Sequence, residues 1–301
     1  DETPRVRMTM RSLLFVPGDD EKKLSKGAGS GADALLIDLE DSVSPARKQA
    51  AREITAAYLA AHRGASGPAL YVRVNALDTG LTDGDLDAIM VAGPAGIMLP
   101  KACGGVDVTH LGAKLAVREA ENDLVDGATR IIAIGTETAR SIFAVGTFAG
   151  ASHRLTGIAW GAEDLAADIG AETNKALDGG FSEPFRLARN LCLFGAAAAE
   201  VTPIDTVYTD FRNEAGLASE TEQARRDGFQ AKMAIHPAQV AVINRVFTPT
   251  REAIDHSRAV VAAFAANPEA GVVGINGKMI DRPHLKQALR ILDRATAAGI
   301  A

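Results

Sequence analysis

Short apolar runs alternate along this chain with longer segments in which apolar residues recur at the spacing of an α-helix. The runs are rich in Leu, Ile and Val and are apolar at consecutive positions, as in RSLLFVPG at 11–18 and ALLIDLED at 34–41. Strands that are apolar on both faces are typical of parallel sheets covered by helices. Further strands of this kind are predicted at Ala69–Ala76, Gly96–Lys101, Arg130–Thr138, Leu155–Gly161, Val201–Tyr208 and Ala231–Pro237.

Helix-initiating residues follow several of these runs. Asp19 or Asp20 can cap a helix that reaches Ser30, and Ser44 followed by Pro45 begins a helical segment that reaches His62. The remaining predicted helices between strands are Asp83–Val91, Val106–Glu121, Ala139–Ala149, Glu183–Ala199 and Asn213–Asp227.

About eight strand–helix units predict an α/β fold of the (β/α)₈ TIM barrel type, whereas five or six would favour an open doubly wound sheet. A dinucleotide-binding sheet would place a G-x-G-x-x-G turn after the first strand, but the glycines at 27–31 lie at the end of the first helix instead. We therefore expect a barrel over residues 1–247.

Residues 248–301 have no place in a minimal barrel and are predicted to form a helical extension that acts as a lid, a subunit contact or both. Beyond a helix at Gln239–Phe247, the chain shows helical segments at Arg251–Ala266 and His284–Ala298, separated by the Gly-rich stretch GVVGINGKMIDRP at 271–283.

The composition is that of a globular protein, with 47% hydrophobic and 23% charged residues. A formal net charge of −6 argues against nucleic-acid binding, which needs a basic face. No apolar run reaches the ~18 residues of a membrane span, and residues 1–10 lack the apolar core of a signal peptide. Cys103 and Cys192 are far apart and are expected to be reduced thiols, so a cytoplasmic location is expected.

Charged side chains gather at the ends of the predicted strands, where barrel enzymes build their active sites. They are Asp38, Glu40, Asp41, Arg73, Lys101, Glu137, Glu163, Asp164, Asp205 and His236. Any one of them could simply cap a helix or lie in solvent. So many charges converging on one barrel mouth would be costly to bury unless they were paired or bound a ligand.

Two of these carboxylates, Glu137 and Asp164, have no Cys or His beside them in the sequence. Hard oxygen donors suit Mg²⁺, and the absence of a His pair at i, i+4 argues against zinc. A metal of this kind polarises the carbonyl of a 2-keto acid, while a cation such as Arg73 can hold the oxygen of an enolate. Lys101 offers the alternatives of a Schiff-base lysine and of an anion-binding lysine.

With these residues in view, the chain resembles the citrate lyase β-subunit and the malyl-CoA and citramalyl-CoA lyases, within the HpcH/HpaI aldolase superfamily. The matching blocks follow in the family's order: RSLLFVPG, ADALLIDLEDSV, VRVN, GIMLPK, TETA, GAEDLAADIGA, IDTVYTD, GFQAKMAIHP and GKMIDRP. Two departures, Ala231 in place of a glycine and an unusual segment at 102–115, bear on substrate identity more than on reaction type.

The resemblance implies a metal and a catalytic role for residues of the barrel. Glu137 and Asp164 correspond to the Mg²⁺ ligands, and Arg73 to the arginine at the thioester carbonyl and enolate oxygen. Glu40 and Asp41 match the acidic block that orients this arginine and metal-bound waters.

Other roles implied by the resemblance lie outside the barrel mouth or at its rim. Asp281 is similar to an acid/base that these enzymes deliver from a neighbouring subunit, which implies a homo-oligomer, a trimer or a hexamer. Lys22, Lys23 and Lys26 lie where relatives hold the phosphates of CoA, and Lys101 is a further candidate for substrate binding.

The predicted activity is reversible, Mg²⁺-dependent cleavage of a 3-hydroxyacyl-CoA into acetyl-CoA and a 2-keto acid such as glyoxylate or pyruvate. Three alternatives stay open on the sequence alone. They are the citryl-acyl-carrier-protein lyase subunit of a citrate lyase complex, a malyl-CoA thioesterase, and a barrel kept as a ligand-binding or assembly subunit.

Overall fold

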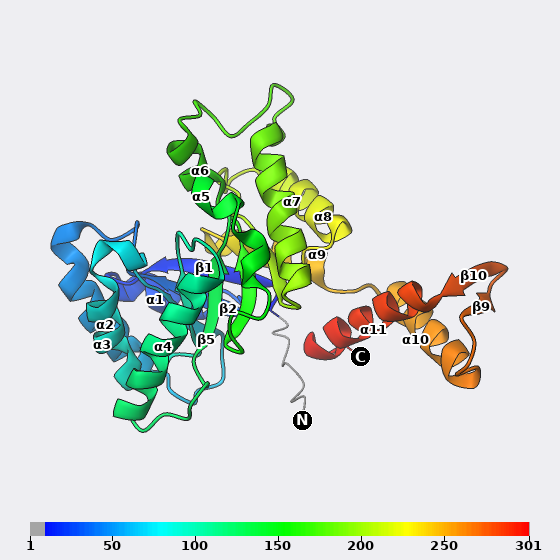
Figure 1. The fold of residues 1–301 in the computed structure, drawn as a ribbon, viewed down its shortest axis with the longest axis horizontal. Coiled ribbons are helices and arrows are strands. Elements are labelled where there is room, and N and C mark those ends of the chain that lie inside the picture. Colours follow the sequence, from blue (N-terminus) through cyan, green and yellow to red (C-terminus); the bar gives the residue numbers. More distant parts are fainter. Residues whose placement is uncertain (1–9, 301) are drawn as a thin grey trace. The chain divides into compact units, whose positions relative to one another are not determined.

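Eight parallel strands close into a barrel in the computed structural model, which describes residues 10–300 (Figure 1). Each strand pairs with the next along the chain, and β1 closes the ring against β8 through Leu13 and Met233. The strands are β1 Ser12–Pro17, β2 Ala34–Asp38, β3 Ala69–Arg73, β4 Gly96–Leu99, β5 Arg130–Ile134, β6 Leu155–Ala159, β7 Thr202–Asp205 and β8 Ala231–Ala234. The predicted barrel is confirmed, and each strand is shorter at its carboxyl end than the predicted run; β2, β3 and β7 end on the polar residues Asp38, Arg73 and Asp205.

Helices follow the strands in chain order. They are α1 Glu21–Ala28, α2 Lys48–Ala61, α3 Thr82–Ile89, α4 Gly105–Glu121, α5 Ala139–Ile142, α6 Ala162–Ile169, α7 Glu183–Ala198, α8 Glu214–Asp227 and α9 Pro237–Phe247. Asp20 caps α1 by accepting a hydrogen bond from the Lys23 amide. The single helix predicted over Ala139–Ala149 is wrong, because α5 ends after one turn and a 3₁₀ helix follows at Val145–Phe148. The short helix α6 was not predicted.

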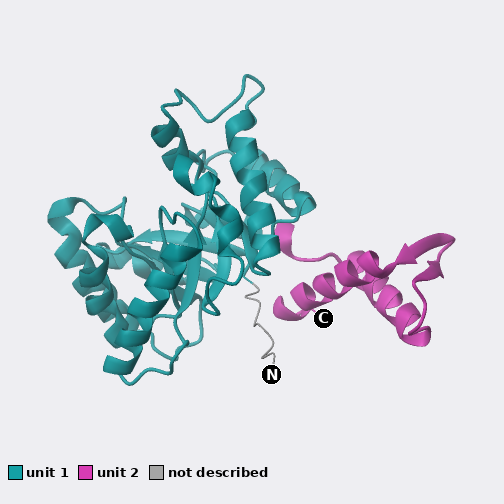
Figure 2. Cartoon of the chain, in the orientation of Figure 1, with its two compact units in different colours: residues 1–244 teal, residues 245–301 magenta. Residues whose placement is uncertain are grey.

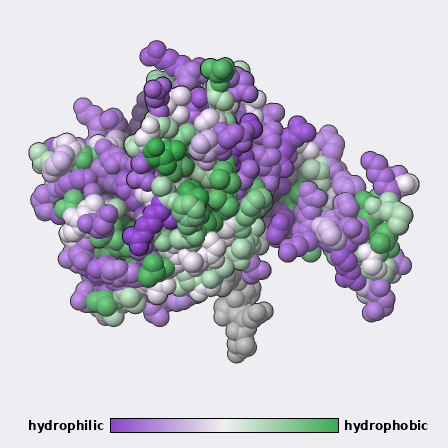
Figure 3. Space-filling view, turned by 45° about the horizontal axis from the view of Figure 1, so that its top comes forward, coloured by the Kyte–Doolittle hydropathy of each residue, from purple (hydrophilic) through white to green (hydrophobic). Residues whose placement is uncertain are grey.

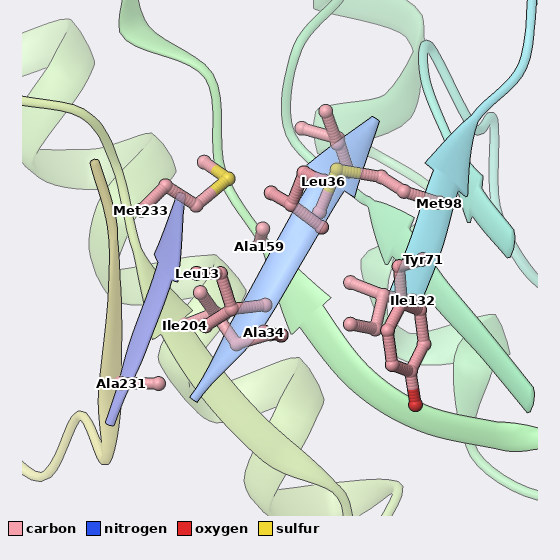
Figure 4. Packing of buried hydrophobic residues seen from close by; sticks show 11 residues of the cluster. Leu13, Ala34, Leu36, Tyr71, Met98, Ile132, Ala159, Ile204, Ala231 and Met233 are labelled. Carbon is pink, nitrogen blue, oxygen red and sulfur yellow. The ribbon is translucent and has the colours of Figure 1, made fainter. Parts of the chain in front are cut away.

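The barrel interior is filled by apolar side chains of alternating size (Figure 4). Tyr71 and Met98 lie in the same cluster as the small residues Ala34, Ala159 and Ala231. A Cβ atom at Gly96 would lie 2.2 Å from the Tyr71 ring, so this glycine makes the space that the tyrosine fills. The interior is therefore a packed core, and chemistry is confined to the mouth above it.

A buried ion pair between Glu119 of α4 and Arg154 joins two segments on the outside of the barrel. Both Arg154 Nη atoms donate to the Glu119 carboxylate at 2.8 and 2.7 Å, and the amides of Gly127 and Thr129 donate to the same group. Burial alone would raise the pKa of Glu119, but these hydrogen bonds outweigh it and lower the pKa to about 2.

Replacing Glu119 by Gln is expected to lower the free energy of unfolding by about 3 kcal/mol, because it leaves the buried Arg154 with the exposed Asp126 as its remaining charged partner. The folded-state pKa lies below the ordinary value of 4.5, so the stabilisation is present above pH 4.5 and is lost as the pH falls toward 2. Urea unfolding of both proteins between pH 7 and pH 3 measures this. Equal stabilities at pH 7 would contradict the prediction.

The chain divides into two compact units, residues 1–244 and 245–301 (Figure 2). The second unit contains α10 Arg251–Ala266, the hairpin β9 Val272–Ile275 and β10 Lys278–Asp281, and α11 Arg282–Ala297. Its own small core is formed by Val260, Phe264, Val273, Ile280 and Ala288.

The hairpin of the second unit was missed in the sequence, although its turn carries a clear signal. Asn276 and Gly277 connect β9 to β10 with φ of 50° and 75°. Asn-Gly is the preferred pair for two-residue hairpin turns in which both residues have positive φ.

None of the helices within residues 10–300 combines the length and apolar character that crossing a membrane requires. Residues 1–9, which belong to the segment where no apolar signal-peptide core is expected, lie outside the described part of the chain.

Candidate active site

Arg73, the last residue of β3, is held at the barrel mouth by Asp38, the last residue of β2. Its Nε and Nη2 atoms donate to the two oxygens of Asp38, both at 2.7 Å, and its guanidinium lies 4.7 Å from the centre of the Phe15 ring. Asp38 also accepts the amides of Glu40 and Ser42, which fix the loop that follows β2. A guanidinium held in this bidentate way is fixed in both position and plane.

Glu40 continues the ion network from Arg73 to Lys101. Glu40 Oε2 lies 3.0 Å from Arg73 Nη1, and Glu40 Oε1 accepts a hydrogen bond from Lys101 Nζ at 2.6 Å. Asp41 lies further out, with 58% of its side chain exposed, and approaches Arg73 Nη1 and Lys101 Nζ at 3.9 and 3.6 Å. The structure thus brings together Arg73, Glu40, Asp41 and Lys101.

Glu137 and Asp164 join the same cluster through Lys101. The Lys101 amide donates to Glu137 Oε2 at 2.6 Å, and Lys101 Nζ lies 3.1 Å from Asp164 Oδ1. Glu137 follows β5 and Asp164 lies in the first turn of α6, after β6. Gly161 leaves room for the Glu137 side chain, because a Cβ atom at residue 161 would lie 3.0 Å from Glu137 Cγ.

The carboxyl groups of the mouth differ in the direction in which their pKa values are shifted: the pKa of Asp38 is lowered, and those of Glu40 and Glu137 are raised. Burial would raise the pKa of Asp38, but Arg73 outweighs it and holds that pKa below its ordinary value. Burial, followed by the charge of Asp164, raises the pKa of Glu137 to about 8. Burial also raises the pKa of Glu40, although Arg73 and Lys101 oppose the shift. Glu137 is therefore a buried carboxyl group whose charged form is disfavoured by burial and by the neighbouring charge of Asp164.

These residues fit a hard divalent cation. Within residues 10–300, no group of three or more His, Cys, Asp and Glu side chains converges as a metal cage. Mg²⁺ does not need such a cage, because it commonly uses one or two carboxylates and completes its shell with water and substrate oxygens. A cation held by Glu137 and Asp164 would oppose the effects of burial and of the Asp164 charge, which raise the pKa of Glu137 in that order of size.

Residues 11–237 match the family described as HpcH/HpaI aldolase/citrate lyase. The chain belongs to this family. It is 36% identical over 298 residues to the citrate lyase subunit beta of Escherichia coli, covering 98% of this chain and 96% of the relative. The (3S)-malyl-CoA thioesterase of Cereibacter sphaeroides is 35% identical, covering 95% of each chain. The mitochondrial citramalyl-CoA lyase of Rattus norvegicus is 33% identical, covering 95% and 86%.

A solved structure of CitE from Mycobacterium tuberculosis, in complex with magnesium, acetoacetate and coenzyme A, has the same fold. Its TM-score is 0.76 at 31% identity, and the alignment covers 97% of this chain and 99% of that one. The family resemblance inferred from the sequence blocks is thereby confirmed. The homologues are lyases and a thioesterase that act on citrate-type or acyl-CoA substrates, and the structural neighbour carries a divalent metal.

Other residues singled out in the sequence belong to α1 and to the second unit. Lys22 and Lys26 are exposed one turn apart on α1, and Lys23 pairs with Asp20. Asp281 belongs to the second unit, where it ends β10 and caps α11 through His284. The side-chain hydrogen bond from His284, which is the main cause, lowers the pKa of Asp281. The proposed roles of these residues stay predictions.

Asp205 was wrongly grouped with the barrel mouth. It accepts hydrogen bonds from Trp160 Nε1 and from the fully buried Lys232 Nζ, at 2.8 and 2.7 Å, and lies 3.7 Å from Arg189 of α7. Because Ile204 points into the barrel core, its neighbour Asp205 points outward beneath the helices. Trp160 is fully buried. His236 Nδ1 accepts the Ala238 amide and holds the turn after β8.

Sequence reasoning missed the part played by Asp38, Phe15 and Thr136. Asp38, rather than Glu40 or Asp41, makes the bidentate pair with Arg73. The alternation of strand residues was the available signal, since Leu36 and Tyr71 point into the core and Asp38 and Arg73 follow two residues later. Thr136 Oγ1 is buried beside Glu137 in the chain and has no hydrogen-bond partner among the described residues.

Proposed function

We propose that the protein is a Mg²⁺-dependent carbon–carbon lyase that reversibly cleaves a 3-hydroxyacyl-CoA into acetyl-CoA and a 2-keto acid. One observation carries this proposal: an arginine fixed by a bidentate carboxylate lies in the same ion network as two carboxylates, Glu137 and Asp164, that can hold a metal. That arrangement provides an anion-stabilising cation beside a site for a hard metal. The family membership supports the same chemistry.

Each residue has a distinct part in the proposed reaction. The metal, when bound by Glu137 and Asp164, would polarise the keto-acid carbonyl as a Lewis acid. In the cleavage direction the hydroxyl proton passes to water, the carbon–oxygen bond becomes the carbonyl of the 2-keto acid, the carbon–carbon bond breaks, and its electron pair enters the thioester enolate. Arg73 would hold the negative charge that develops on the enolate oxygen. Glu40 and Asp41 would keep Arg73 and bound waters in place, and Lys22, Lys26 and Lys101 would bind CoA or the acyl group.

Asp281 would deliver the proton to the enolate carbon from the second unit of a neighbouring subunit, in a trimer or hexamer. Its carboxylate is about half exposed, and it would take a proton from the acetyl carbon in the condensation direction and return it in the cleavage direction. Light scattering combined with activity assays across a dilution series tests this arrangement. A fully active monomer would contradict it.

A hydrophobic area on the first unit supports subunit association (Figure 3). Phe143 and Phe194 are exposed by 93% and 65%. The segments that carry them are adjacent, because a Cβ atom at Gly195 would lie 2.3 Å from the Val145 side chain. Large exposed apolar side chains that gather on one face are typical of protein contact sites.

A second candidate function is the citryl-acyl-carrier-protein lyase subunit, which the E. coli relative favours. It uses a carrier-protein thioester, so the purified chain alone would be inactive on free CoA esters. A malyl-CoA thioesterase, which the C. sphaeroides relative favours, would release free CoA without forming acetyl-CoA. A binding or assembly subunit would turn over no thioester.

A panel assay tests the function directly. Acetyl-CoA and propionyl-CoA are each combined with glyoxylate, pyruvate or oxaloacetate, with and without Mg²⁺, and the acyl-CoA products are measured by mass spectrometry. We expect at least one pair to condense, and chelation to remove that activity until Mg²⁺ is returned. Free CoA as the main product, or no turnover of any pair, would contradict the proposed lyase.

A further inference from the structure

Lys101 contacts every acidic side chain assigned to the metal and to the positioning of Arg73 except Asp38. Its Nζ atom lies 2.6 Å from Glu40 Oε1, 3.1 Å from Asp164 Oδ1 and 3.6 Å from Asp41 Oδ2. Its amide donates to Glu137 Oε2 at 2.6 Å. One residue therefore binds both proposed metal ligands at once.

The backbone at Lys101 is arranged to make these contacts. Lys101 follows β4 and Pro100, and its φ of 51° lies in the left-handed region that a lysine seldom adopts. In this conformation the amide and the side chain of Lys101 both reach acidic residues of the mouth. A strained residue of this kind persists only where its surroundings compensate for the strain, and such residues cluster at functional sites.

The ion pairs around Lys101 compensate for the strain of its left-handed backbone. Five carboxylates, those of Asp38, Glu40, Asp41, Glu137 and Asp164, are linked through Arg73 and Lys101. Arg73 is committed to Asp38 through its bidentate pair. Within residues 10–300, the ion pair of Asp164 is made with Lys101, whose ammonium group lies 3.1 Å from Asp164 Oδ1, one of the oxygens where a metal ion would bind.

We propose that Lys101 is an internal counter-ion of the metal site, which holds Asp164 while the site is empty and releases it when a divalent cation binds. This inference rests on the proposed role of Glu137 and Asp164 as metal ligands. An ammonium group and a magnesium ion compete for the same carboxylate, and each repels the other at short distance. The lysine would keep the acidic mouth stable without metal and would weaken metal binding.

The opposite role for Lys101 would be to assist metal binding. A lysine that only positions Asp164 for the metal would strengthen metal binding, so its loss would lower the affinity. The two roles therefore predict opposite changes when the ammonium group is removed, and the direction of the change decides between them.

Calorimetric titration of Mg²⁺ into the wild-type protein, Lys101→Met and Lys101→Gln tests the proposal. We expect both variants to bind Mg²⁺ about tenfold more tightly, because one positive charge next to the cation is gone. Their melting temperatures without metal should fall, and the rise on adding Mg²⁺ should exceed that of the wild type. Lys101→Gln retains a polar side chain and gives the same comparison if Lys101→Met does not fold.

Lys175→Met is the matched control, because Lys175 Nζ lies 3.6 Å from Glu220 and its side chain is 36% exposed, against 31% for Lys101. Its Mg²⁺ affinity should stay within about twofold of the wild type. Equal or weaker binding by both Lys101 variants would overturn the counter-ion role and leave the metal assignment intact. Failure of the wild-type protein to bind Mg²⁺ would overturn both the metal assignment and this inference.

Discussion

Glu137→Gln and Asp164→Asn are each expected to lower Mg²⁺-dependent turnover by about 10³-fold or more. Each substitution keeps the size of the side chain and removes one of the two negative charges proposed to bind the metal. Loss of the Lewis acid removes several kcal/mol of stabilisation from the transition state, and each 1.4 kcal/mol corresponds to about a factor of ten. Steady-state kinetics over a Mg²⁺ series, with affinity measured by calorimetry, gives both the rate and the cause.

Glu163→Gln is the matched control, since Glu163 is adjacent to Asp164 in α6 but accepts a hydrogen bond from Asn174 instead of contacting Lys101. It should retain turnover within a few-fold of the wild type. Circular dichroism and thermal unfolding establish that the variants are folded. Full activity of Glu137→Gln and Asp164→Asn after chelation and return of Mg²⁺ would refute the metal assignment.

Arg73→Lys is expected to lower kcat by about 10²–10³-fold, the effect typical of losing one donor to a developing oxyanion. A lysine keeps the charge but cannot make the paired hydrogen bonds to Asp38 or keep a planar group over the Phe15 ring. The positive charge is therefore retained without its fixed position. Steady-state kinetics should show a loss in kcat that exceeds any change in KM.

Arg11→Lys provides the comparison for this variant. Arg11 makes a similar bidentate pair with Asp33, through Nε at 2.9 Å and Nη2 at 2.8 Å, but precedes β1 at the opposite end of the barrel. It should change stability more than kcat. A kcat for Arg73→Lys close to that of the wild type would show that Arg73 does not stabilise the transition state.

The architecture of this protein could be predicted because local patterns determine it. Consecutive apolar residues at Ala34–Ile37 and Ile131–Ile134 are typical of strands covered on both faces, and repetition of this pattern between helical segments predicts a barrel. Strand ends of a barrel meet at one mouth, so the grouping of Arg73, Glu40 and Lys101 also followed from chain order. The hairpin that turns at Asn276 and Gly277 was not predicted, although its Asn-Gly pair is a local signal for such a turn.

Pairing within the mouth could not be predicted from one chain. Asp38 rather than Glu40 holds Arg73 in the bidentate pair because β2 and β3 are in register at Asp38 and Arg73, and register depends on how the barrel closes. The outward direction of Asp205 likewise follows from its position next to Ile204 on the barrel wall. Position along a strand shows that a charge is near the mouth, but not the face on which it lies.

The sequence by itself determined the closed barrel, the family and the set of charged residues at the mouth, because periodicity and short motifs are local properties. Only the tertiary structure decided that Lys101 binds Glu40, Glu137 and Asp164 together. Those residues come from β-strand ends that are far apart in the chain, and the left-handed backbone of Lys101 depends on them. Contacts between distant segments depend on register and backbone geometry, which the order of residue types does not contain.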